Sequence, residues 1–117
     1  MKNFKELIIW QKGINITMAA YELTMTFPKE ETYNLISQIR RSAVSIPSNI
    51  AEGNSRDSEN DKHRFMEIAL GSAFELETQL IIASKLNYGK IELVNSLINL
   101  IDEEQKMLMA YMKKLKP

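Results

Sequence analysis

Apolar residues recur at spacings of three and four along most of the chain, which is the pattern of helices with one face in a core. Short segments containing proline or glycine interrupt the pattern at three places. It predicts helices from Phe4 to Met25, from Phe27-Pro28 to Gly53, from Asp57 or Ser58 to Asn87-Tyr88-Gly89, and from about Lys90 to Leu115. Because the connections are short, we expect one domain over residues 1–117, an all-α, antiparallel up-down four-helix bundle of long helices.

One stripe on each helix is predicted to face the core. The stripes of the first two helices are Leu7, Trp10, Ile14, Met18, Tyr21 and Met25, and Ile36, Ile39, Ala43, Ile46 and Ile50, with Gly53 next in phase. Those of the last two are Phe65, Ile68, Ala69, Ser72, Leu76, Leu80, Ala83 and Leu86, and Val94, Ile98, Ile101, Leu108, Met112 and Leu115, with Gln105 in phase.

Pro47 lies inside the stripe of the second helix and cannot donate a hydrogen bond to the Ala43 carbonyl. The helix therefore either ends near Ile46 or continues through a kink. The phase of Ile50 favours the kink, and the polar side chains of Ser45, Ser48 and Asn49 are expected to bond the freed backbone groups.

The ends of the third helix carry capping residues. Ser58 with Asp61 three positions later resembles a capping box, with aspartate in place of glutamate. Gly89 is the expected left-handed residue at the other end.

Three helices carry a second apolar stripe, and a monomeric bundle needs only one. The alternative is that the second stripe consists of single apolar residues exposed to solvent, which are normal on protein surfaces. We instead expect a homo-oligomer, with an interface formed by Ile9, Ile16, Leu23, Phe27, Met66, Leu70, Phe74, Ile81, Leu93, Leu100, Met107 and Tyr111.

Composition narrows the class of protein. The absence of cysteine excludes disulfides, thiolate metal sites and a cysteine nucleophile, and it suits a cytoplasmic location. No apolar run is long enough to span a membrane, and no signal peptide is evident. Fifteen basic and fifteen acidic residues cancel, which argues against nucleic acid as the main partner.

Candidate catalytic and metal-binding groups do not converge. A di-metal bundle site needs two Glu-x-x-His pairs, whereas His63 is the only histidine and Asn60 precedes it by three. Glu75 and Glu77 point about 160° apart on a helix; Glu75 and Gln79 suit a structural polar network with a neighbouring helix. We predict no enzyme activity, cofactor or metal.

A set of basic residues offers an alternative function. A phosphate-contacting strip on the second helix and the following turn would comprise Arg40, Arg41, Arg56, Lys62 and Arg64. The opposing interpretation is that the arginines form ion pairs between helices or between subunits, with Glu52 and the glutamates of the third helix, because acidic residues interrupt the basic field.

The stretch Q-I-R-R-S-A-V-S-I-P-S-N-I-A-E-G from Gln38 to Gly53 closely resembles the four-helix bundle proteins encoded in intervening sequences of bacterial 23S ribosomal RNA genes. The resemblance extends to Trp10-Gln11-Lys12, to Phe27-Pro28-Lys29-Glu30-Glu31 and to Phe65–Leu80. It implies a ring, with pentamers known, and no assigned molecular function.

A related family is the accessory variability determinant of diversity-generating retroelements, a basic pentamer that binds nucleic acid. The present chain lacks a basic excess. We therefore expect a non-enzymatic, ring-forming protein that acts by binding; the alternative is an accessory protein that binds structured RNA.

Overall fold

The computed structural model describes residues 3–115, so residues 1–2 and 116–117 of the predicted domain lie outside it. The described chain is mostly helical and contains no strand. Its elements are the short 3-10 helices η1 (Phe4–Glu6) and η2 (Lys29–Glu31), and the α-helices α1 (Ile8–Thr24), α2 (Leu35–Asn54), α3 (Glu59–Lys85) and α4 (Ile91–Lys114). The predicted all-α, four-helix fold is confirmed.

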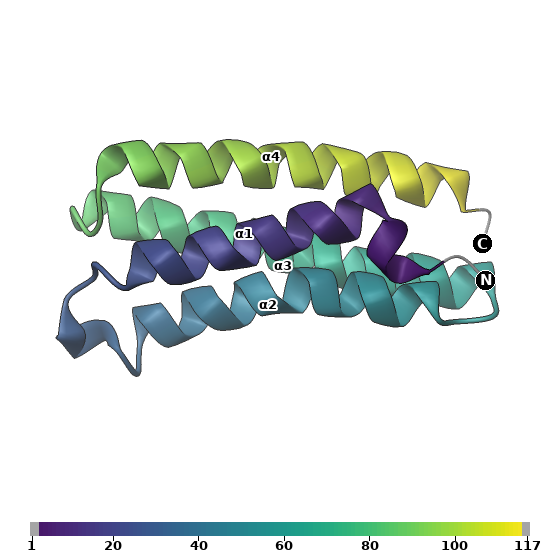
Figure 1. Ribbon diagram of the computed structural model, residues 1–117, viewed down its shortest axis with the longest axis horizontal. Coiled ribbons are helices and arrows are strands. Elements are labelled where there is room, and N and C mark those ends of the chain that lie inside the picture. The colour runs from purple at the N-terminus through teal and green to yellow at the C-terminus, as the bar shows by residue number, and fades with distance from the viewer. Residues whose placement is uncertain (1–2, 116–117) are drawn as a thin grey trace.

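The four α-helices lie side by side along the longest axis of a body measuring 43 × 23 × 21 Å (Figure 1). Figure 1 also shows the chain reversing direction at each connection. Each helix packs against two others, in the closed order α1, α2, α3, α4 and back to α1. The side formed by α1 and α2 is therefore opposite the side formed by α3 and α4.

The predicted seam of α2 is confirmed, because all five of its apolar residues are buried. Gly53 continues this seam and is also buried. A Cβ atom at Gly53 would lie only 2.7 Å from the Cβ of Phe65, so α2 and α3 approach each other too closely here for a side chain. The glycine thus has a packing role at the end of α2.

Helix α2 continues through Pro47, so the alternative in which it ends near Ile46 is wrong. The Ala43 carbonyl freed by the proline lies 3.0 Å from Thr17 Oγ1 of α1, whose single hydroxyl proton is shared between this carbonyl and that of Gly13 at 2.9 Å. The predicted donors were residues of α2 itself, but Asn49 Nδ2 donates to the Ser45 carbonyl instead. A side chain of the neighbouring helix α1 therefore bonds the Ala43 carbonyl. The bend at Pro47 stays a prediction.

The predicted core stripe of the first helix is right at its start, where Leu7 is buried and Trp10 packs against the core, and wrong along the rest of α1. Met18 and Met25 are 64% and 77% exposed, whereas Ile16 and Leu23 on the opposite side are buried. Both sides of this helix are apolar, so periodicity alone could not identify the buried one. The side that carries Gly13 faces the core because α1 packs closely there: a Cβ atom at Gly13 would lie 3.2 Å from the Cβ of Pro47.

The predicted helix ends need two corrections. Helix α2 begins at Leu35 rather than at Pro28, because the backbone of Asn34 (φ −126°, ψ −103°) separates it from η2. At the end of α3, Asn87 takes the left-handed capping position, with φ 61°; Gly89 is left-handed as predicted, with φ 75°, but lies two residues farther on. The bonds from Tyr88 N–H to the Ala83 carbonyl and from Asn87 N–H to the Ser84 carbonyl form a Schellman motif.

The start of α3 agrees with the sequence. Ser58 is its N-cap residue, and the Ser58 side chain accepts a hydrogen bond from the Asp61 N–H at 3.1 Å. This bond satisfies one of the donors that a helix leaves unpaired at its start.

Candidate binding surfaces

Much of the predicted oligomer interface lies inside the single chain. Five of its residues, Ile9, Ile16, Leu23, Phe27 and Met66, are buried in the core and cannot contact another molecule. The prediction is wrong for these residues: Ile9, Ile16 and Leu23 lie on the side of α1 that faces the core, and Phe27 and, on α3, Met66 are buried as well. Leu70, Leu100, Met107 and Tyr111 are partly buried and pack against the core. Phe74, Ile81 and Leu93 are exposed.

A different apolar surface is exposed along α1 and α2, formed by Met18, Tyr21, Met25, Tyr33 and Val44, and we call it the α1–α2 face. On α1, its residues recur at spacings of three and four, and so they share one side of the helix. Tyr33 is 96% exposed at the turn that precedes α2. The helical spacing predicts that Met18, Tyr21 and Met25 of this face lie in the core, whereas all three are exposed.

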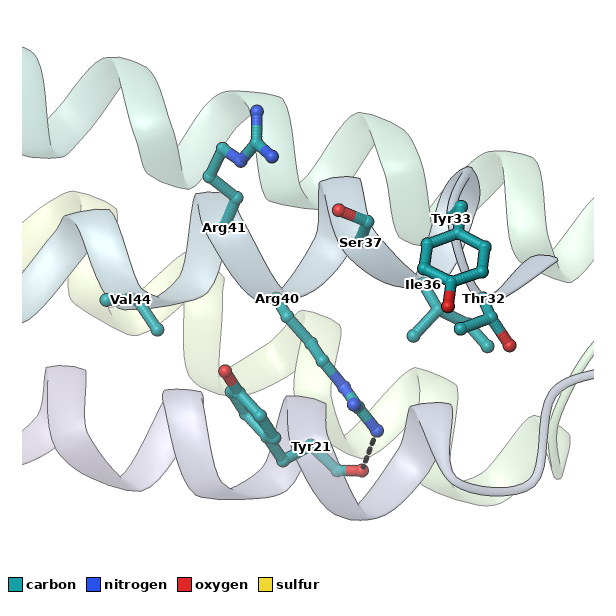
Figure 2. A pocket seen from close by; sticks show the side chains of 8 residues that line it. All are labelled: Tyr21, Thr32, Tyr33, Ile36, Ser37, Arg40, Arg41 and Val44. Carbon is teal, nitrogen blue, oxygen red and sulfur yellow. Dashed lines mark hydrogen bonds between the residues drawn. The ribbon is translucent and has the colours of Figure 1, made fainter. Parts of the chain in front are cut away.

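The α1–α2 face contains a pocket of about 480 Å³, shown in Figure 2. Tyr21 contributes from α1, Val44 and Arg40 contribute from α2, and Tyr33 lies near one end. Figure 2 shows Arg40 extending from α2 towards α1, whereas Arg41 points away from α1. The pocket is thus an open depression of mixed polarity, and both Arg40 and Arg41 are among its lining residues.

Arg40 is held by α1 rather than by a carboxylate. Its Nε donates to Thr24 Oγ1 at 2.9 Å and its Nη2 lies 3.5 Å from the Tyr21 carbonyl oxygen. The guanidinium carbon also lies 4.5 Å from the centroid of the Tyr21 ring, a cation–π distance. These contacts fix the ring and the guanidinium in the pocket wall.

A second exposed apolar surface lies on the opposite side of the bundle, where Phe74 and Ile81 of α3 and Met109 of α4 form the α3–α4 face. Gln105 Nε2 of α4 donates to Glu77 Oε1 of α3 at 2.9 Å. Phe74 and Ile81 lie three residues before and four after Glu77, so helix geometry places them on the side of α3 next to α4. This contact involves Glu77 rather than the predicted Glu75.

The five candidate nucleic-acid residues form two groups rather than one strip. Arg40 and Arg41 lie in the first half of α2. Arg56 comes sixteen residues after Arg40, just past the end of α2, and sixteen residues correspond to about 24 Å along a helix. Arg56 pairs with Glu52 at 2.9 Å, and Lys62 Nζ donates to the Asn54 carbonyl at 3.0 Å. Arg41 and Arg64 are exposed. Because Glu52 is only four residues before Arg56, this ion pair is local and is not the predicted pairing of Arg40 or Arg41 between helices or subunits.

A polar cleft of about 330 Å³ lies at the surface between α2 and α3, and we call it the α2–α3 cleft. Its lining residues are Gln38, Arg41, Ser42, Ser45, Ser72, Glu75 and Gln79. The Ser45 and Ser72 hydroxyls are hydrogen-bonded to each other at 2.8 Å across the two helices. Gln79 is buried, with 6% of its surface exposed, and its Oε1 has no hydrogen-bond partner.

Glu104 carries a buried carboxyl group whose burial was not predicted from the sequence. It is 0% exposed, and neither of its carboxyl oxygens has a hydrogen-bond partner. Burial raises the pKa of Glu104 from its ordinary value of 4.5 to about 8, and the charge of Lys12 opposes this shift. Position 104 lies between Ile101 and Leu108 at spacings of three and four, so its phase could have identified it.

The part of the chain that the structure describes contains neither a cluster of metal ligands nor a membrane-spanning helix. Within residues 3–115, no group of three histidine, cysteine, aspartate or glutamate side chains is placed to hold a metal ion. His63 Nδ1 lies 3.6 Å from Glu67 Oε1 on the same helix. No helix in that part of the chain is both long and apolar enough to cross a lipid bilayer.

These observations define a class: an all-helical, four-helix bundle with exposed apolar faces on opposite sides. The chain belongs to the 23S rRNA-intervening sequence protein family, whose sequence model matches residues 5–110. The family resemblance stated from the sequence is confirmed.

A solved structure supports the fold assignment. A protein of unknown function from the S23 ribosomal protein family of Bacteroides thetaiotaomicron VPI-5482 is 26% identical in sequence, with a TM-score of 0.82. The match covers 91% of the present chain and 99% of the other. None of the curated proteins matches the chain.

Proposed function

We propose that this protein is a non-enzymatic bundle that assembles into a homo-oligomeric ring and acts by binding. The observation that carries the proposal is the pair of exposed apolar faces on opposite sides of one chain. In the ring, the α1–α2 face of one copy contacts the α3–α4 face of the next. Contacts between two different faces form a closed ring when the rotation between copies closes.

The α1–α2 pocket supports this arrangement. Its volume of about 480 Å³ gives room for an aromatic side chain, and Phe74 on the α3–α4 face is 47% exposed. Transferring apolar surface of this kind out of water gains about 25 cal/mol per Å². The family resemblance suggests five copies, which would turn two modest faces on each chain into five identical junctions.

Mass measurement on charged variants tests the proposal. Val44→Glu places a carboxylate on the α1–α2 face, and Phe74→Glu places one on the α3–α4 face. Each variant is expected to be smaller than the unmodified ring, because a buried unpaired charge opposes the junction. Ile82→Glu is the matched control: Ile82 is 44% exposed on α3 but points about 100° away from Ile81, so the ring should persist.

A mixture of the two variants tests how the faces pair. Val44→Glu retains an intact α3–α4 face, and Phe74→Glu retains an intact α1–α2 face. Together they should form one junction, and so a dimer that neither variant forms alone. A contact between identical faces would instead let each variant dimerise by itself, which would contradict the proposed pairing.

The nucleic-acid alternative draws its support from Arg41 and Arg64, the exposed members of the basic set. Binding of this kind would weaken steeply as salt increases. We expect at most weak binding to structured RNA at low salt, reduced by Arg41→Gln. Tight, salt-sensitive binding would favour the alternative over a ring with another ligand.

A further inference from the structure

We propose that the α2–α3 cleft binds a small zwitterion with one ammonium and one carboxylate group, of the α-amino acid class. The cleft lies between the two faces assigned to ring contacts, on a side of the bundle that the proposed ring leaves uncovered. The proposal therefore does not depend on the ring.

The wall formed by α3 offers hydrogen-bond acceptors. Glu75 and Gln79 are four residues apart, so both side chains lie on the same side of the helix. Glu75 is exposed, and Gln79 Oε1 is a buried acceptor with no partner. The Glu75 carboxylate is therefore the acceptor on this wall that a ligand N–H group can reach.

The wall formed by α2 offers a donor. The exposed Arg41 guanidinium lines the cleft together with Glu75. No ion pair within 4.0 Å joins these two groups among the described residues. The cleft thus has an unpaired positive group on one wall and an unpaired negative group on the other.

Hydrogen bonds fix the two serine side chains at the floor of the cleft, which Ser45 and Ser72 form. Ser45 and Ser72 are hydrogen-bonded to each other, and Asn49 Nδ2 donates to Ser45 Oγ at 2.9 Å. These bonds hold α2 and α3 at a fixed separation. Because the floor holds the two walls in place, a ligand meets groups that need little reorganisation, which favours affinity.

The chemistry of the walls selects the ligand. A ligand carboxylate would accept two hydrogen bonds from Arg41, and a ligand ammonium would donate to Glu75. A dianion would meet the Glu75 carboxylate, and a diamine would meet Arg41. The volume of about 330 Å³ is at the lower end of the range for small-molecule sites, which suits a molecule of amino-acid size.

Calorimetry with the common L-amino acids, each titrated singly into the full chain, tests the proposal. Putrescine and succinate serve as probes that carry one sign of charge only. We expect at least one amino acid to bind with Kd below about 1 mM, and neither single-sign probe to match it.

Two exposed substitutions link the binding to the cleft. Arg41→Gln and Glu75→Gln should each weaken binding at least about tenfold, because each removes one charge-assisted contact. Arg64→Gln, an exposed arginine outside the cleft, should leave binding unchanged.

Three results would overturn the assignment: no binding by any amino acid, equal binding of putrescine or succinate, or binding that neither cleft variant weakens. The mass of the Glu75→Gln variant, measured in parallel, should match that of the unmodified chain, because Glu75 lines the cleft but not the α1–α2 pocket. A loss of binding with unchanged mass separates this site from the ring contacts.

Discussion

Glu104 should make the stability of the bundle fall as the pH rises through neutrality. Burial raises the pKa of Glu104 to about 8 in the folded chain, against 4.5 for the exposed group. Between these values the unfolded chain releases the proton and the folded chain retains it. Since the folded state binds more protons in this window, the free energy of unfolding decreases from about pH 4.5 to about pH 8.

The magnitude follows from the size of the shift. One pKa unit corresponds to about 1.4 kcal/mol, so the full shift is worth on the order of 3–5 kcal/mol. That is a large part of the stability of a small domain, which is commonly about 5–15 kcal/mol. The Lys12 charge limits the shift, and Lys12→Met should therefore raise the Glu104 pKa further.

Urea unfolding at several pH values, with the chain concentration held constant, measures this effect. Glu104→Gln keeps the shape of the side chain but cannot ionise, so its stability should depend less on pH than that of the unmodified chain. Glu103→Gln is the matched control: the Glu103 side chain is 60% exposed and pairs with Lys12, and its removal should leave most of the pH dependence in place. Parallel pH profiles for the unmodified chain and Glu104→Gln would refute the reasoning.

Two further predictions concern helix packing, and both are measured by urea unfolding. Thr17→Val should lower the free energy of unfolding by about 1–3 kcal/mol, because the Ala43 carbonyl loses its donor, whereas Thr17→Ser should retain most of it; equal stabilities would contradict the role of Thr17. Gly53→Ala should destabilise by about 1–3 kcal/mol through its clash with Phe65. Gly71→Ala, at a helical position with no atom within 4 Å of the added Cβ, should stabilise by about 0.5–1 kcal/mol, and the opposite order of the two glycine variants would refute the packing argument.

The sequence was sufficient for the fold class because helical periodicity persists through four segments with short connections. The seam of α2 was predictable in detail, since apolar residues occupy one side of that helix and polar residues most of the rest. Its passage through Pro47 was also predicted, but the donor to Ala43 was not. Thr17 comes from a different helix, and no local pattern indicates such a contact.

The surfaces were harder to predict than the core of α2. Helix α1 is apolar on two sides, so the buried side depended on where Gly13 and Pro47 meet. Because of this ambiguity, Ile16 and Leu23 were predicted to lie in the oligomer interface, whereas they are buried in the core. Glu104 was missed for another reason: glutamate is rarely buried, although position 104 lies in phase with Ile101 and Leu108.

The mass of the unmodified protein in solution is the most direct test of the proposed assembly. One chain has a mass of 13.5 kDa. Light scattering coupled to size-exclusion chromatography should give a whole-number multiple of that value, with five copies as the expectation from the family. A mass of 13.5 kDa that persists as the concentration rises would contradict a ring formed through the α1–α2 and α3–α4 faces.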